Sequence, residues 1–355
     1  MMLGERIKQA RMVSGMSTRA LAEQAGISAQ AISKYERNMD TPSSGVLIRL
    51  SKALNVKTEY FFRDRTINLS AVSFRKRASL PRKEENAVLG SMKEWLERYL
   101  DVEDLFPNGQ GCSFQFLSGI GTHVKKIEDV ETIAEELRQA WDLGFDPIVN
   151  LMELFEDKGI KVFLVDADQG FDACTFVTDD GTPVVAIKNG LPGDRQRFNL
   201  AHELAHNILT TDDGIDAEKV CHRFAGAFLV PKPAVYRELG QKRSNLSEYE
   251  LLLLKYKYGL SMQAWIYRAR DLGIISETLA SRLFRRFRSR GWHIKEPGKQ
   301  LQAETPERIE RLVMRAVAED VISHTRAAEL LGKPLRQFCQ EGSAQNDGFT
   351  VDLCD

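Results

Sequence analysis

Cysteines and long apolar runs are scarce in this chain, and each scarcity excludes a class of protein. The 355 residues include only five cysteines, at positions 112, 174, 221, 339 and 354, and these lack the paired spacing of metal-binding cysteines. We therefore expect them to be reduced, as in an intracellular protein. No apolar run reaches the length of about eighteen residues that a membrane helix needs, and MMLGERIKQA lacks the apolar core of a signal peptide. These absences predict a cytoplasmic protein with no membrane partner.

The charge of the chain is balanced overall but divided unevenly along it. The formal net charge is −1, yet residues 1–83 hold sixteen Lys and Arg against six Asp and Glu, which gives +10 and leaves −11 for the rest. A basic N-terminal segment on an acidic body is expected when one part of a protein meets a phosphate backbone. The length predicts two or three domains, and 43% apolar residues suffice for their cores.

The most informative motif is AHELAH, in which His202, Glu203 and His206 follow the HExxH pattern of zinc hydrolases. Residues four apart lie on one face of a helix, so His202 and His206 can bind one metal ion while Glu203 reaches the metal's water. The surrounding RFNLAHELAHNIL is largely apolar and has no proline or glycine, which predicts a mostly buried helix. The alternative is a pair of core histidines that are satisfied by their neighbours.

A catalytic zinc ion takes three protein ligands, so a third ligand must come from elsewhere. The segment EKVCHRFAGAFLVP has apolar residues at helical spacing, which predicts a second helix beside the first. Glu218 and His222 share its other face, and the spacing leaves open which is a ligand and which a supporting partner; Glu218 is our choice of ligand. The acids before this helix are weaker candidates, more typical of loops and helix caps: Asp212, Asp213 and Asp216.

Two imidazoles and a carboxylate in this arrangement predict peptide-bond hydrolysis. Zinc would lower the pKa of its water and polarise the scissile carbonyl, while Glu203 takes the water's proton and passes it to the leaving nitrogen. The same donors accept several divalent ions, so we expect one Zn²⁺ per chain without excluding Mn²⁺. Spacing does not identify an oxyanion-stabilising residue, although His222 and Tyr236 follow the motif closely.

The N-terminal residues predict a helix-turn-helix. We expect two short helices in STRALAEQAG and ISAQAISKYERN, joined by a turn at Gly26, because glycine readily adopts positive φ. Ser17 and Ser28 are candidate caps of these helices. Apolar residues of both segments would close a small core: Leu21, Ala22, Ala25, Ile27, Ile32 and Tyr35.

The second of these helices would enter a major groove. Gln30 is the best candidate for reading an adenine, and Thr18 on the preceding helix could touch a phosphate or a base edge. The DNA-contacting set that we predict is Thr18, Ser28, Ala29, Gln30, Ser33, Lys34 and Arg37. The alternative is a solvated polar helix face. The basic cluster at 75–77, with Arg82 and Lys83, could equally add phosphate contacts or solvate a linker.

Two family resemblances follow from these motifs. Residues 5–62 resemble the XRE (Cro/CI-type) DNA-binding domain, through ALAEQAGIS, AISKYERN and IRLSKALNV. Residues from about 130 to 232 resemble the ImmA/IrrE metallopeptidase family, through IAEELRQAWDLGFDPIVNLMELFEDKGIKVF, RQRFNLAHELAHNIL and EKVCHRFAGAFLVP. Together they cover somewhat under half of the chain. The second resemblance implies zinc at His202 and His206, with Glu203 as base and Glu218 as third ligand, although members commonly have Ala-Asn where this chain has Cys221 and His222.

The resemblance also implies a function. Relatives cleave repressor proteins and so switch on phage, mobile-element or stress-response genes. Because both modules lie on one chain here, we expect a regulator that cleaves its own or a partner's DNA-binding domain, and a palindromic operator would suit a homodimer. The competing class is a non-enzymatic transcription factor that uses the peptidase fold to sense a ligand or partner. A third class, a zinc enzyme acting on a small amide, predicts no sequence-specific DNA complex.

The expected fold is multidomain and mainly α, with one α+β part. We expect an all-α helix-turn-helix domain at 1–66, a helical linker or dimerisation segment at 67–127, a zincin-like α+β metallopeptidase domain at 128–235 and a helical C-terminal sensor or docking region at 236–355. KVFLVDAD, ACTFVTD and PVVAIKNG predict the small sheet. Near the C-terminus, VISHTRAAELLGKPLRQF resembles a second helix-turn-helix, and we favour a packing role for it. The cluster of Arg285, Arg286, Arg288 and Arg290 reads as a phosphate-binding patch or a solvated helix end.

Overall fold

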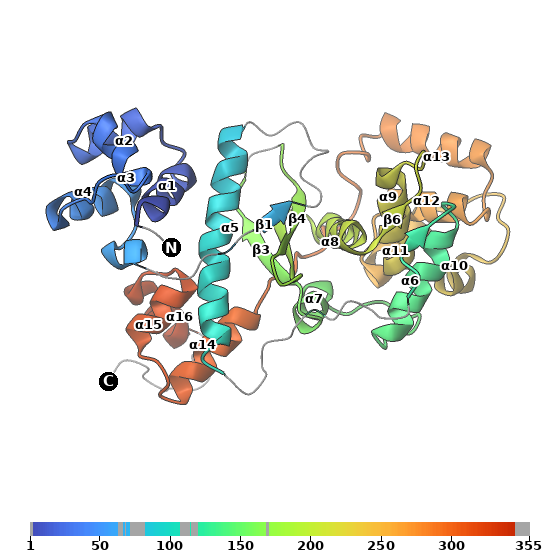
Figure 1. Ribbon diagram of the computed structural model, residues 1–355. Helices are drawn as coiled ribbons and strands as arrows, with labels where there is room; N and C mark the ends of the chain where they lie inside the picture. The colour runs from blue at the N-terminus through green and yellow to red at the C-terminus, as the bar shows by residue number, and fades with distance from the viewer. Residues whose placement is uncertain are drawn as a thin grey trace. The chain divides into compact units, whose positions relative to one another are not determined.

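The chain divides into two compact units, which are described separately. The computed structural model describes residues 3–62, 67, 69–71, 82–106, 114, 120–167 and 170–344. Unit 1 comprises residues 1–69, 77–111 and 307–355, and unit 2 comprises residues 70–76 and 112–306 (Figure 1). The basic cluster at 75–77 and the cysteines at 112 and 354 lie outside the described residues. Within the described ranges, no helix has the length and apolar character needed to cross a membrane.

Unit 1 begins with the predicted helix-turn-helix. Its helices are α1 (Leu3–Val13), α2 (Thr18–Ala25), α3 (Ala29–Glu36) and α4 (Ser44–Leu54), followed by a 3₁₀ turn at Thr58–Phe62. Ser17 and Ser28 cap α2 and α3, their hydroxyls accepting from the amides of Ala20 and Ala31. Gly26 ends α2 at φ 63°, the left-handed conformation that glycine adopts most easily. Both predicted caps and the predicted turn are thereby confirmed.

The remaining helices of unit 1 pack on one long helix, α5 (Arg82–Glu103). This helix lies in the segment 67–127 that we expected to link or dimerise. The C-terminal helices of the unit are α14 (Arg308–Ala318), α15 (His324–Leu331) and α16 (Leu335–Ala344). The helix α5 packs against α1, α14 and α15, and five of its apolar residues are buried: Val88, Met92, Leu96, Tyr99 and Val102. Leu330 and Phe338 join one apolar cluster with Val102, which is consistent with the packing role that we favoured for the C-terminal segment.

Unit 2 contains the predicted sheet. Its strand order is β1-β4-β5-β3, with β1 (Leu69–Ala71), β3 (Lys161–Val165), β4 (Ala173–Thr178) and β5 (Pro183–Lys188). β5 pairs parallel with β3 and antiparallel with β4. A second, two-stranded sheet joins β2 (His123–Val124) to β6 (Thr210–Thr211). The three predicted strand segments therefore form β3, β4 and β5.

Helices supply most of the core of unit 2. They are α6 (Asp129–Ala140), α7 (Leu151–Asp157), α8 (Gly193–Ile208), α9 (Ala217–Leu229), α10 (Lys232–Leu239), α11 (Glu248–Tyr258), α12 (Met262–Asp271) and α13 (Glu277–Ser289). A buried ion pair joins α6 to α12, since Arg268 donates two hydrogen bonds of 2.7 and 2.9 Å to the Glu131 carboxylate. Arg286 of α13 and Arg290, which follows the end of α13, both pair with Glu248 of α11, so part of the predicted arginine patch is engaged.

The sheet and two helices position the HExxH motif. α8 packs on β4 and β5, and α9 packs beside α8, as predicted for the second helix. Asn207 of α8 donates a 2.6 Å hydrogen bond to the Thr175 hydroxyl on β4 and a second bond to the Glu203 carbonyl oxygen. The predicted mainly α architecture with a small sheet is confirmed.

The contacts group the C-terminal residues differently from the predicted segment 236–355. Residues up to 306 belong with the sheet and the helices α8 and α9, and residues from 307 onward belong with α5. The division follows from where each helix finds an apolar partner, which the local periodicity of a helix does not specify.

Candidate metal centre

The motif lies on a buried helix, as its apolar surroundings predict. His202 and Glu203 are each 2% exposed on α8, and His206 is half-buried one turn further on. Because His202 and His206 are four residues apart, their rings lie on the same side of the helix, with centroids 4.8 Å apart. Glu218 comes from the first turn of α9, where Asp216 caps the helix by accepting from the amides of Glu218 and Lys219.

Three donor atoms meet where α8 and α9 face each other. The Nε2 atoms of His202 and His206 are 3.1 Å apart, and the Glu218 carboxylate oxygens lie 3.3 Å from the first and 3.5 Å from the second. In the described part of the chain, these three residues form the group of His, Cys, Asp and Glu side chains that could hold a metal ion. Zinc bonds of about 2.0–2.1 Å at the tetrahedral angle separate neighbouring ligand atoms by about 3.3 Å. The donors therefore fit a zinc ion in both type and spacing.

His206 has a partner that the sequence analysis missed. The Cys221 sulfur lies 3.6 Å from the Nδ1 atom of His206, on the side of the ring opposite the shared donor cluster. The helical spacing of the apolar residues groups Cys221 with the apolar face of the second helix. Its position three residues after Glu218 was the available signal, because residues three apart are neighbours on a helix.

His222 lies beside the cluster but outside the group of three donors. Its Nδ1–H donates to the Glu218 carbonyl oxygen at 2.7 Å, and its ring lies 4.5 Å from that of His202, centroid to centroid. The ring is exposed, so His222 stands at the open side of the cluster. The spacing left open whether Glu218 or His222 is the third ligand. In the structure, the Glu218 carboxylate faces the histidine nitrogens, and His222 lies beside the cluster.

The other acids are not members of the donor group, and Tyr236 lies on a further helix. Asp212 lies 2.7 Å from His123 Nε2, Asp213 is exposed, and Asp216 is the cap already described. Tyr236 is on α10, where the Lys232 ammonium lies 5.8 Å from its ring centroid. The loop and cap roles expected for the acids match these positions.

In unit 1, the predicted DNA-contacting residues lie on α2, on α3, at the N-terminal cap of α3 and, for Arg37, at its C-terminal cap. Gln30, Lys34 and Arg37 are exposed, as groove contacts require. Ser33 accepts a hydrogen bond of 2.8 Å from Arg37, which joins two members of the set. The remaining members are more engaged in the fold: Thr18 is half-buried, Ser28 is a cap, and Ala29 packs on the core.

Comparisons with known proteins agree with both parts of this description. Residues 7–61 match the family model described as Helix-turn-helix, and residues 155–270 match the one described as IrrE N-terminal-like domain. The chain is similar to the HTH-type transcriptional regulator ImmR of Bacillus subtilis, at 38% identity over 60 residues, or 17% of this chain and 47% of that protein. It is also similar to the uncharacterized HTH-type transcriptional regulator y4wC of Sinorhizobium fredii, at 41% identity over 66 residues, or 19% of this chain and 46% of that protein.

The chain spans about half the length of the curated relatives it matches. The predicted resemblance is confirmed, because the matched segments place an XRE-type helix-turn-helix and an ImmA/IrrE-like domain on one chain.

Proposed function

Because the chain joins a helix-turn-helix domain to an IrrE-like domain, we propose that it is a DNA-binding transcriptional regulator with a zinc-dependent endopeptidase centre. Its substrate would be a repressor, either this chain or a partner protein, and cleavage would control phage, mobile-element or stress-response genes. Its other partner would be a double-stranded DNA operator bound by a homodimer, which places its action in the cytoplasm. The basic charge of residues 1–83 and the exposed α3 residues support the DNA-binding part.

The observation that carries the enzymatic part is the convergence of three donors. Two neutral imidazoles and one carboxylate make a set that zinc accepts, and a catalytic site leaves the fourth position to water. His202, His206 and Glu218 would hold one zinc ion, with manganese as the alternative metal. When bound, zinc lowers the pKa of a water molecule and polarises a carbonyl group.

The chain's own residues would then move the proton. Glu203 follows His202 directly on α8 and is 2% exposed, so its carboxylate is shielded from bulk water. It would accept the proton of the attacking water and deliver it to the leaving nitrogen. The Nδ1–H of His222 is engaged by the Glu218 carbonyl oxygen, so only its Nε2 side would be free to face a substrate.

The variant Glu203→Gln tests this assignment. It keeps the size of the side chain and removes the base, so we expect wild-type zinc content and DNA affinity with loss of cleavage of the repressor. Glu136→Gln, an exposed position on α6, makes the same change away from the site and should leave all three properties unchanged. Equal regulatory output from Glu203→Gln and wild type would favour the non-enzymatic transcription factor, which senses a ligand or partner through the same fold.

A further inference from the structure

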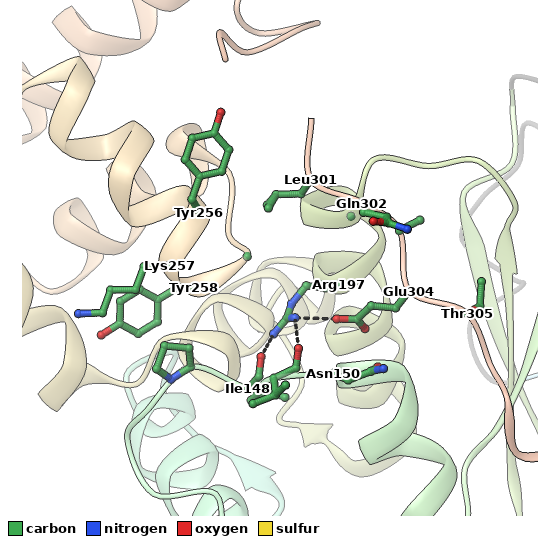
Figure 2. A pocket seen from close by; sticks show the side chains of 15 residues that line it. Ile148, Asn150, Arg197, Tyr256, Lys257, Tyr258, Leu301, Gln302, Glu304 and Thr305 are labelled. Carbon is green, nitrogen blue, oxygen red and sulfur yellow. Dashed lines mark hydrogen bonds and ion pairs between the residues drawn. The ribbon is translucent and has the colours of Figure 1, made fainter. Parts of the chain in front are cut away.

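A second site lies in unit 2, beside the N-terminal half of α8. It is a cavity of about 610 Å³, bordered by the turn before α7, by Gly193 and Arg197 of α8, by the end of α11, and by residues 301–305 (Figure 2). This volume is in the range of small-molecule sites, about 300–1,000 Å³. None of the three metal-centre donors borders it. The cavity is therefore separate from the candidate metal centre, although both involve α8.

One wall of the cavity is a segment without helix or strand that is fixed to α8. The Gly193 amide donates to the Leu301 carbonyl oxygen at 3.0 Å, and Gln196 exchanges two hydrogen bonds with the backbone of Glu304. A Cβ atom at position 193 would stand 2.2 Å from the carbonyl oxygen of Gln302, so only glycine permits this approach. These contacts fix the wall to α8.

Arg197 is the charged group of this cavity. Its residue is 8% exposed, and its guanidinium donates to Glu304 at 2.6 Å and to the Ile148 carbonyl oxygen at 2.5 Å. Its Nε atom is buried and has no hydrogen-bond partner among the described residues. Burial lowers the pKa of Arg197, and the neighbouring Glu304 only partly opposes this. The guanidinium also donates to the Val149 carbonyl oxygen at 3.4 Å, so its Nε–H is the group that a further acceptor would stabilise.

The hydrogen-bond acceptors of the side chains around Arg197 are already engaged, whereas some hydrogen-bond donors have no acceptor. One Glu304 oxygen accepts from Arg197 and the other from the amides of Leu151 and Met152. The Asn150 side-chain oxygen caps α7 by accepting from Glu153, while its amide nitrogen makes no hydrogen bond within the described part of the chain. Buried or half-buried donors without acceptors call for a ligand that is rich in acceptors.

The border of the cavity is apolar and exposed. Val149 is 95% exposed and Tyr256 is 39% exposed, and both contribute to the lining. A purely polar anion would leave these two side chains in water, whereas a ligand with an apolar body would cover them.

We propose that this cavity binds a small organic carboxylate with an apolar or aromatic body. The carboxylate accepts from Arg197 and Asn150, and the body packs on Tyr256 and Val149. The inference goes beyond the proposed function, since ligand binding here requires neither the metal nor peptidase activity. Arg197 precedes His202 by five residues on α8, so the ligand contacts the helix that carries the metal-binding histidines.

Fluorine NMR on the full-length chain tests the proposal with two probes, para-fluorobenzoate and its neutral amide, para-fluorobenzamide. The decisive variant is Asn150→Asp, which keeps the oxygen that caps α7 and replaces the donor by a negative charge. Asn245→Asp makes the same charge change at an exposed position away from the cavity. Tyr256→Ala and Tyr249→Ala form a second matched pair on α11, because only Tyr256 lines the cavity.

We expect the benzoate to bind the wild-type chain and the amide to bind about tenfold more weakly. Asn150→Asp should weaken benzoate binding about tenfold through like-charge repulsion, and Asn245→Asp should not change it. Tyr256→Ala should weaken it as well, with Tyr249→Ala unchanged. Equal binding of the two probes, equal binding by the two Asn→Asp variants, or no binding of the benzoate would each overturn the proposal. The first of these outcomes would indicate a site for neutral ligands, and the last a cavity that holds water only.

Discussion

Replacing Cys221 by alanine should weaken zinc binding although Cys221 is not one of the three donors. A histidine that binds a metal through Nε2 keeps its proton on Nδ1, and the partner of that Nδ1–H fixes the ring's orientation and tautomer. The Cys221 sulfur lies 3.6 Å from Nδ1 of His206 and is the partner in that position. Its loss would remove the contact that orients the ring.

The expected size of the effect follows from this distance. Removing the partner of a ligating histidine lowers metal affinity by about 10–100-fold. Hydrogen bonds to sulfur are weak and the observed contact is long, so we expect the lower end, about tenfold or 1.4 kcal/mol. Cys221→Ser should lose less, because a hydroxyl oxygen still accepts from Nδ1–H.

Competition for zinc against a chromogenic chelator at neutral pH measures the change. Cys174→Ala is the matched control, since Cys174 is also buried in unit 2. It neighbours Thr175, which contacts Asn207 of α8, and adjacent strand residues point to opposite faces of a sheet. Wild-type zinc affinity in Cys221→Ala, or an equal loss in Cys174→Ala, would refute the argument.

Three further predictions concern the rest of the molecule. Lys34→Ala should weaken binding to all DNA sequences alike and reduce the slope of log affinity against log salt concentration by about 1, whereas Gln30→Ala should relax the sequence preference. Fluorescence anisotropy measures both effects, and unchanged DNA binding would count against α3 as the recognition helix. Burial raises the pKa of Glu131, but hydrogen bonds and charges from Arg268 and Arg223 outweigh it and leave the pKa lowered. Ionised Glu131 therefore stabilises the fold above its unfolded pKa, and this stability is lost as the pH falls through the lower folded pKa. Between these two pKa values, the unfolding free energy of a Glu131→Gln variant, measured by acid unfolding, should change with pH less steeply than that of the wild type, by about 1.4 kcal/mol per pH unit. Gly193→Ala should lower the unfolding free energy, because its Cβ would collide with Gln302; a thermal melt equal to that of wild type would contradict this.

The features that the sequence predicted are those encoded locally. The HExxH spacing determines that His202 and His206 share a helix face, and the apolar residues around them determine that this face is buried. Ser17, Ser28 and Gly26 act as caps and turn through bonds to residues at most four positions away. Glu218 could be chosen because a carboxylate at the start of a helix next to α8 can reach the histidines.

The features that the sequence did not predict depend on distant contacts. Arg197 and Glu304 are 107 positions apart, and Arg6 and Glu97, a buried pair in unit 1, are 91 apart. No periodicity links such pairs, so the cavity beside α8 was not foreseen. The packing of α14 and α15 on α5 has the same origin, because an amphipathic helix specifies that it needs an apolar partner and does not specify which one.

Metal content of the purified chain and of a His202→Ala variant, by mass spectrometry, tests the central claim most directly. We predict about one zinc ion per chain in the wild type and its loss in the variant, since His202 is one of three converging donors. Circular dichroism on both proteins would separate loss of metal from loss of fold. Absence of metal from the wild type even after zinc is added would contradict the account, and would leave the IrrE-like domain as a sensor without a metal centre.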